Sequence, residues 1–102
     1  MQTQRITGGL AVTAIWQSRD GEADAVADIL TRFAPKAREE PGVQLFLVHR
    51  GVADPQQFLF YELFENEAAF AAHQQTEHFR SMILEDGVPR LTRRERMQYA
   101  VL

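Results

Sequence analysis

Residues 57–75 read QFLFYELFENEAAFAAHQQ, and this stretch contains the sharpest change of pattern in the chain. Its first nine residues are mostly aromatic and aliphatic, which is typical of a β-strand. Asn66 can then cap a helix, in which Phe70 and His73 lie three positions apart and therefore share one face. The stretch predicts a strand over residues 57–65 that runs into a short helix over residues 68–75.

The segments on the N-terminal side extend this pattern. Residues 43–52 (VQLFLVHRGV) predict a second strand, and the turn-forming residues 53–56 (ADPQ) are few enough for an antiparallel hairpin with the strand that follows. Residues 10–17 (LAVTAIWQ) predict a first strand. Between them an amphipathic helix begins near Glu22, and Pro35 should kink it or end its regular part near Ala34. Its apolar positions have helical spacing: Val26, Ile29, Leu30, Phe33 and Ala37.

The C-terminal part supplies one more helical segment and one more strand. Thr76 can cap a further helical turn, and Gly87 and Pro89 then break the chain. Residues 93–102 alternate in polarity and predict a last strand. The order β-α-β-β-α-β predicts a ferredoxin-like α+β fold, a four-stranded antiparallel sheet with both helices on one face. We expect one domain over residues 1–102, with residues 1–7 as a flexible tail.

The middle strands carry apolar residues on both faces, which predicts a homodimer. Val43, Leu45 and Leu47 share one parity of their strand, whereas Phe46 and Val48 share the other. The next strand repeats this pattern, with Phe58, Phe60 and Phe64 against Leu59, Tyr61 and Leu63. A face that two helices leave uncovered needs another cover, and a second copy is the simplest one. The alternative is partial cover by the connection between the second helix and the last strand.

Composition limits the function classes. The chain has 102 residues, a net charge of −3 and no cysteine. The acidic balance argues against nucleic acid and anionic membranes as partners, and no stretch is apolar enough to span a membrane. Cysteine nucleophiles, thiolate metal sites, phosphate-binding glycine loops and serine elbows lack their residues. Without cysteine or a visible export signal, we expect a cytoplasmic protein.

Three residues are the candidates for catalysis: His73, Glu62 and His78. His73 lies on the predicted sheet-facing side of the second helix, where an imidazole can act as a general base near neutral pH. The structural alternative is a core histidine bonded to a backbone carbonyl. Glu62 is a polar group on an apolar strand face and needs a partner, which a histidine could provide. A metal site from His49, Glu62 and His73 is conceivable, but the spacing does not demand it.

The aromatic residues suggest a pocket for a flat ligand, although such sets are more often plain core. The candidate substrate-binding residues are Trp16, His49, Phe60, Tyr61, Phe70 and Phe79, and Phe64 belongs to the same aromatic set. The chain also has a basic run at Arg90, Arg93, Arg94 and Arg96, which Glu95 interrupts. A solvated edge, or ion pairing across a dimer, explains this run better than a nucleic-acid footprint.

The segment FYELFENEAAFAAHQQTEHFR, residues 60–80, resembles the antibiotic biosynthesis monooxygenase family. In that family a strand of the form Y-E-x-(aromatic) runs into a helix that ends near H-x-x-(S/T)-x-H-F. The matching positions are Tyr61, Glu62, Phe64, His73, Thr76, His78 and Phe79. The end of the first helix at Glu40-Pro41-Gly42 and the turn over residues 50–55 fit as well. The resemblance implies a dimeric α+β barrel in which two sheets pack face to face.

The resemblance also implies an activity. Family members include quinol monooxygenases and oxygenases of aromatic polyketides that use O2 without metal, haem or flavin, so we expect no cofactor. In this chain His73, assisted by Glu62, would remove a phenolic proton from a quinol, phenol or anthrone. Haem-degrading relatives carry a tryptophan at the position of His73 and a haem-binding histidine at that of Ile83, which disfavours haem degradation here. The alternatives are a non-catalytic dimer that binds a small aromatic ligand, and an isomerase of the same family.

Overall fold

The four strands form one antiparallel sheet in the order β2-β3-β1-β4. A computed structural model describes residues 8–102, and residues 1–7, the expected flexible tail, lie outside the described residues. The strands are β1 (Leu10–Ser18), β2 (Val43–Arg50), β3 (Gln57–Phe64) and β4 (Leu91–Ala100). Helices α1 (Ala23–Arg38) and α2 (Glu67–Gln74) complete the β-α-β-β-α-β order, so the predicted ferredoxin-like fold is confirmed.

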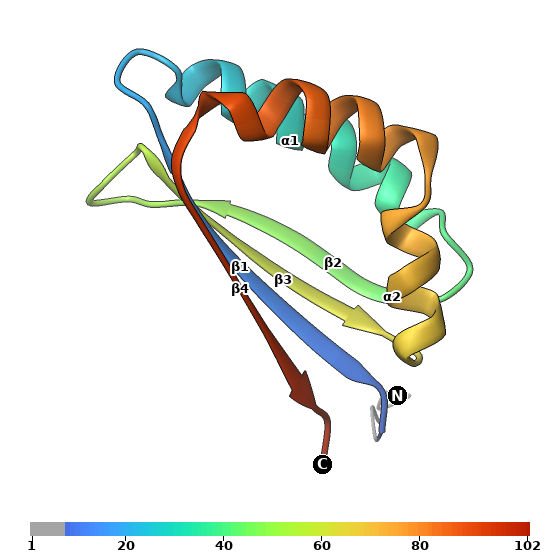
Figure 1. Cartoon of the computed structure of the whole chain (residues 1–102). Coiled ribbons are helices and arrows are strands. Elements are labelled where there is room, and N and C mark those ends of the chain that lie inside the picture. The colour runs from blue at the N-terminus through green and yellow to red at the C-terminus, as the bar shows by residue number, and fades with distance from the viewer. Residues whose placement is uncertain (1–7) are drawn as a thin grey trace, which may run out of the picture.

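All helical segments lie on one side of the sheet (Figure 1). The π-helix η1 (Phe79–Gly87) and the short 3-10 helix η2 (Val88–Arg90) connect α2 to β4 on this same side. The core lies between these helices and the sheet, where Trp16, Phe33, Phe46 and Phe64 are at most 2% exposed. The apolar stripe of α1 therefore packs where its helical spacing predicts.

Side-chain caps define how α2 begins and how η1 follows it. The Asn66 side-chain oxygen accepts a hydrogen bond from the backbone N–H of Ala69 at 2.9 Å, which confirms the predicted cap. The Thr76 hydroxyl accepts from the backbone N–H of Phe79 at 3.2 Å and donates to the carbonyl of His73 at 2.8 Å. The helical segment that we predicted after Thr76 is formed, and its π-helix η1 ends at Gly87, where we expected the chain to break.

Two local predictions are wrong. Of the two alternatives for Pro35, the end near Ala34 is wrong, because helix α1 runs through Pro35 to Arg38, whereas the kink stays a prediction. Pro35 is exposed, so water can satisfy the carbonyl that loses its donor, while the buried neighbours hold the helix in place. In β2, Val43 pairs with Phe64 and Leu45 with Leu63, which leaves one extra residue between them. This bulge moves Val43 from the face of Leu45 to the helix-covered face.

The other face of the sheet is uncovered in the single chain. Its exposed apolar side chains are Leu47, Leu59, Tyr61, Met97 and Tyr99, between 39% and 56% accessible. Partial cover by the connection between α2 and β4 was the alternative to a partner. That alternative is wrong, because this connection lies on the helix-covered side (Figure 1). No helix within residues 8–102 has the length and apolar character to cross a membrane.

Candidate functional site

His73 lies in the last turn of α2 and is only 2% exposed. Its ring is surrounded by four phenylalanine rings at centroid distances from 5.2 to 5.9 Å: Phe33, Phe46, Phe64 and Phe79. This environment follows from the sequence, because Phe70 and His73 share the helix face that α2 turns toward the sheet. His73 is therefore an ionisable group inside an aromatic core.

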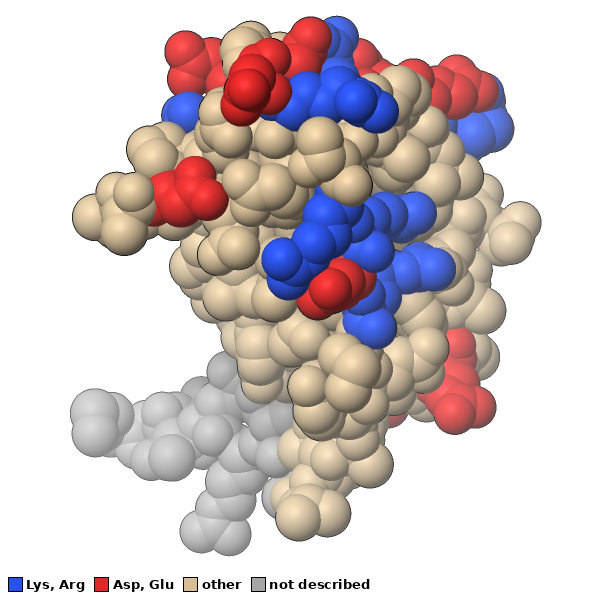
Figure 2. All heavy atoms as spheres, turned by 60° about the vertical axis from the view of Figure 1, so that its left-hand side comes forward, with Lys and Arg blue, Asp and Glu red and all other residues tan. Residues whose placement is uncertain are grey.

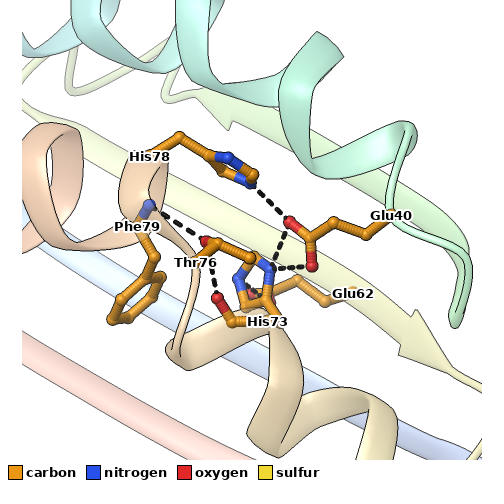
Figure 3. A network of polar contacts seen from close by, with 6 residues as sticks. All are labelled: Glu40, Glu62, His73, Thr76, His78 and Phe79. Carbon is orange, nitrogen blue, oxygen red and sulfur yellow. Dashed lines mark hydrogen bonds and ion pairs between the residues drawn. The ribbon is translucent and has the colours of Figure 1, made fainter.

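The polar partner of His73 is Glu40, which follows α1 directly in the chain. The Nδ1 atom lies 3.0 Å from each carboxylate oxygen of Glu40, and the Nε2 atom of His78 lies 2.7 Å from one of them (Figure 3). A carboxylate accepts hydrogen bonds, so Nδ1 of His73 carries the ring hydrogen and donates a hydrogen bond to Glu40. The expected alternative of a core histidine bonded to a backbone carbonyl is thus not what the structure shows.

The imidazole of His73 is uncharged at neutral pH and can accept a proton. Burial lowers the pKa of His73 below its ordinary value of 6.5, and this effect exceeds the opposing attraction of Glu40. The ring is then neutral at pH 7, with its proton on Nδ1 and a lone pair on Nε2. A carboxylate behind a neutral imidazole is the arrangement that orients a general base and stabilises the imidazolium when it forms.

Glu62 lies in front of the His73 lone pair. Its Oε1 atom is 3.7 Å from His73 Nε2, and its side chain is 8% exposed. Burial raises the pKa of Glu62 to about 8, against the weaker opposing effect of Arg96, while Glu40 raises it further and Arg94 lowers it. At neutral pH Glu62 is therefore a protonated acid that can donate a hydrogen bond, next to a neutral base.

These groups line a small cavity under the helices. Its volume is about 20 Å³, enough for about one water molecule, and Glu62, His73, Arg94 and Arg96 provide its polar wall. A groove of about 380 Å³ adjoins it and shares Val12, Phe70 and Arg96 with the cavity wall. An aromatic ring is too large for the small cavity, but the groove has room for one.

The structure brings together most of the residues expected at the site, but not all. Trp16, Phe60, Phe70 and Phe79 line the cavity with His73 and Glu62, whereas Phe64 packs behind it. His78 reaches the site only through Glu40.

His49 and Tyr61 are not brought to the cavity. Both lie on the uncovered face of the sheet, since side chains alternate along a strand, and His49 bonds to the carbonyl of Leu59 at 3.0 Å. The considered metal site of His49, Glu62 and His73 is therefore not formed. Within residues 8–102 no group of three or more histidine, aspartate or glutamate side chains is placed to hold a metal ion.

Sequence reasoning missed three site residues: Glu40, Arg94 and Arg96. The alternation along β4 was the available signal for the arginines, because Arg94, Arg96 and Gln98 pair opposite Trp16, Ala14 and Val12 on the helix-covered face. Glu40 lies 33 positions from His73, so its approach depends on the loop between α1 and β2. The rest of the basic run is paired: Arg90 with Glu22 and Asp86, and Arg93 with Glu95.

Comparisons with known proteins agree with this fold. The sequence model of the family described as antibiotic biosynthesis monooxygenase matches residues 10–83. A crystal structure from Pseudomonas aeruginosa is 25% identical, with a TM-score of 0.86 over 97% of this chain and 99% of that one. A Shewanella oneidensis protein is 20% identical, with a TM-score of 0.84 over 93% and 92%. A solved structure described as an antibiotic biosynthesis monooxygenase is 22% identical, with a TM-score of 0.79 over 91% and 96%. No curated protein matches the chain.

Proposed function

This chain belongs to the antibiotic biosynthesis monooxygenase family, and we propose that it is a cofactor-independent monooxygenase that oxidises a small quinol, phenol or anthrone with O2. One observation carries the proposal. A neutral histidine, backed by a carboxylate on one ring nitrogen, presents its other nitrogen to a cavity that also contains a protonated carboxylic acid. This is a base and an acid in one cavity with a largely aromatic wall.

The first chemical step is removal of the phenolic proton. The substrate ring lies in the groove, and its hydroxyl passes Phe70 and Arg96 to reach Nε2 of His73. Nε2 accepts the proton, and the Glu40 carboxylate stabilises the imidazolium through the Nδ1 hydrogen bond at 3.0 Å. The product is an electron-rich phenolate whose ring lies in the groove and whose oxygen lies beside the aromatic wall of the cavity.

The second step uses O2 as the oxidant. The phenolate transfers electrons to O2, and one oxygen atom forms a bond to a ring carbon that carries a hydrogen, while the other takes the proton back from the His73 imidazolium and becomes a hydroperoxide. His73, neutral again, then removes the hydrogen of that ring carbon as a proton while the O–O bond breaks and hydroxide leaves, so that a quinol and O2 become a hydroxyquinone and water. The leaving hydroxide needs a proton, and the protonated Glu62 is placed to donate it. The imidazolium of His73 then returns its proton to Glu62.

The proposal includes a homodimer formed through the uncovered face of the sheet. Its support is the exposed row of apolar side chains, because a monomeric protein rarely presents a contiguous apolar surface on this scale. A second copy with the same face would cover it by a two-fold contact, in which each subunit buries the same residues of the other. The cavity lies on the opposite side of the sheet, so each subunit keeps its own site.

O2 uptake by the chelator-treated protein, against a panel of quinols, phenols and anthrones, tests the function. We expect turnover, and we expect His73→Ala to lose about 10²- to 10⁴-fold of the rate, the range for a lost general base. Gln75→Ala, an exposed change two residues later, is the matched control. Thermal shifts with the same compounds but no turnover would favour the non-catalytic binding protein. Full activity of His73→Ala would remove the base from the mechanism.

A further inference from the structure

Two arginines on the helix-covered side of β4 have no anionic partner. Every other arginine within residues 8–102 donates to a carboxylate or to a backbone carbonyl: Arg19, Arg32, Arg38, Arg50, Arg80, Arg90 and Arg93. Among the described residues, Arg94 and Arg96 form neither an ion pair nor a side-chain hydrogen bond. The Nε atom of Arg94 is buried and unsatisfied.

An unsatisfied guanidinium in such a place calls for an explanation. Buried donors almost always find an acceptor, and leaving one without a partner costs free energy. Glu62 does not serve, since it lies beyond ion-pair distance of both arginines and burial keeps its pKa near 8. Burial and the neighbouring Arg96 also lower the pKa of Arg94, because both make its positive charge less favourable. The buried Nε of Arg94 and the exposed guanidinium of Arg96 are therefore both free to bind an anion from outside the chain.

The two arginines are placed to reach a ligand in the site. Both line the cavity that contains His73 and Glu62, and Arg96 also lines the adjoining groove. Figure 2 shows a basic cluster with acidic atoms inside it on one face of the molecule, and Glu95, which lies between Arg94 and Arg96 in the sequence, is paired with Arg93. The charge near the cavity mouth is thus positive in a chain whose net charge is −3.

We propose that Arg94 and Arg96 form a carboxylate-binding subsite, so that the ligand of this cavity is a hydroxylated aromatic acid. The inference rests on the proposed function for the position of the reacting hydroxyl at His73. Guanidinium groups bind carboxylates through two parallel hydrogen bonds, which fixes the ring as well as the charge. A permanent anion fits better than a transient phenolate, because the arginine charges are unpaired before any reaction takes place.

The spacing of the strands matches a single ring. Strand β1 lies between β3 and β4, and Glu62 and Arg96 pair with Val12 and Ala14 of β1, so their backbones are two strand spacings apart across the sheet and two residues apart along it, about 12 Å in all. Long arginine side chains shorten this separation at the level of the cavity. A benzene ring with a carboxylate at one position and a hydroxyl at another can therefore contact the arginines and His73 at once.

Binding measured without O2 tests the subsite. Isothermal titration calorimetry under nitrogen compares 2,5-dihydroxybenzoate with its methyl ester and with hydroquinone. We expect the acid to bind about 10- to 100-fold more tightly than the ester, and Arg94→Met and Arg96→Met to lose this preference. Arg93→Met, on the same strand but on the opposite face, should retain it. Equal binding of acid and ester by the unmodified protein, or a preference that survives both cavity variants, would overturn the proposal.

Two further readouts separate the possible failures. Methionine keeps the apolar stem of arginine, so Arg94→Met should unfold at the same temperature as the unmodified protein or above it. A marked loss of stability would instead assign Arg94 a purely structural role. Arginine-dependent binding of the acid without O2 uptake would leave the subsite standing and remove the monooxygenase. O2 uptake with neutral quinols, together with equal binding of the acid and its ester, would support the monooxygenase and overturn the carboxylate-binding subsite.

Discussion

Replacing Glu62 with glutamine should stabilise the protein at neutral and alkaline pH. Burial raises the pKa of Glu62 from 4.5 to about 8, so over this interval the native state keeps a proton that the unfolded chain has released. The unfolded chain then binds fewer protons than the native one, and the free energy of unfolding falls as the pH rises from about 4.5 to about 8. Glutamine keeps the shape and a hydrogen-bond donor but has no such proton to lose.

The size of the effect follows from the same interval. Each pH unit corresponds to about 1.36 kcal/mol, so the interval from 4.5 to about 8 gives an upper limit on the order of 5 kcal/mol. The lowered pKa of His73 acts in the opposite direction, because the unfolded chain takes up a proton there below pH 6.5. Between pH 6.5 and 8 only Glu62 of these two contributes, and roughly 2 kcal/mol should be lost.

Urea unfolding at half-unit steps from pH 5.5 to 9 measures this dependence. The unmodified protein should lose stability between pH 6.5 and 8, and Glu62→Gln should not, so the two curves diverge with rising pH. Glu65→Gln, an exposed neighbour, is the control and should follow the unmodified protein. If the curves of Glu62→Gln and the unmodified protein run parallel over this range, Glu62 is not a protonated acid at neutral pH. Its role as proton donor to the leaving hydroxide would fall with that result.

Three other changes give distinct outcomes. Glu40→Gln should lower kcat by up to about 100-fold. It should also move the acidic limb of the pH–rate profile to lower pH, because Glu40 raises the pKa of His73. An unchanged profile would show that Glu40 does not act on His73 during catalysis. Leu59→Glu, at an apolar position 42% exposed on the uncovered face, should leave a monomer near 11.7 kDa by light scattering, whereas we expect the unmodified protein to be a dimer. A monomeric unmodified protein at micromolar concentration would contradict the dimer. Asn66→Ala removes the cap that accepts from Ala69 and should cost about 1 kcal/mol in thermal unfolding, whereas no loss would show that water replaces the cap.

The sequence predicts those features of the fold that depend on near neighbours. The aromatic and aliphatic run over residues 57–64 predicts β3, and the helical spacing from Val26 to Ala37 predicts α1, since both patterns lie within a short stretch of sequence. The bulge between Val43 and Leu45 leaves no such trace, because it is defined by the partner strand. Pro35 misleads for the same reason: its local preference is outweighed by the packing of the residues around it.

The candidate site likewise contains residues that local sequence patterns reveal and residues that they do not. His73 and Glu62 are visible as polar residues in apolar patterns, and the structure places them 3.7 Å apart. The contact of Glu40 with His73 cannot be predicted from local sequence, because it depends on where the loop after α1 returns to the sheet. Arg94 and Arg96 are visible as charges, yet the run that contains them also includes Arg93, which faces the other way. Only the register with β1 shows which of these arginines turn toward the cavity.

The arginines and Glu62 should also influence each other during binding. Arg96 and Arg94 both lower the pKa of Glu62, although burial outweighs them. A ligand carboxylate on these arginines would neutralise their charge and add its own, so the pKa of Glu62 should rise further when the ligand binds. Near pH 8, where Glu62 is partly ionised, binding should then take up protons. Calorimetry in buffers of different ionisation enthalpy measures this uptake, and Glu62→Gln should abolish it. The acid that supplies the last proton of the reaction would therefore be most fully protonated when the substrate is in place.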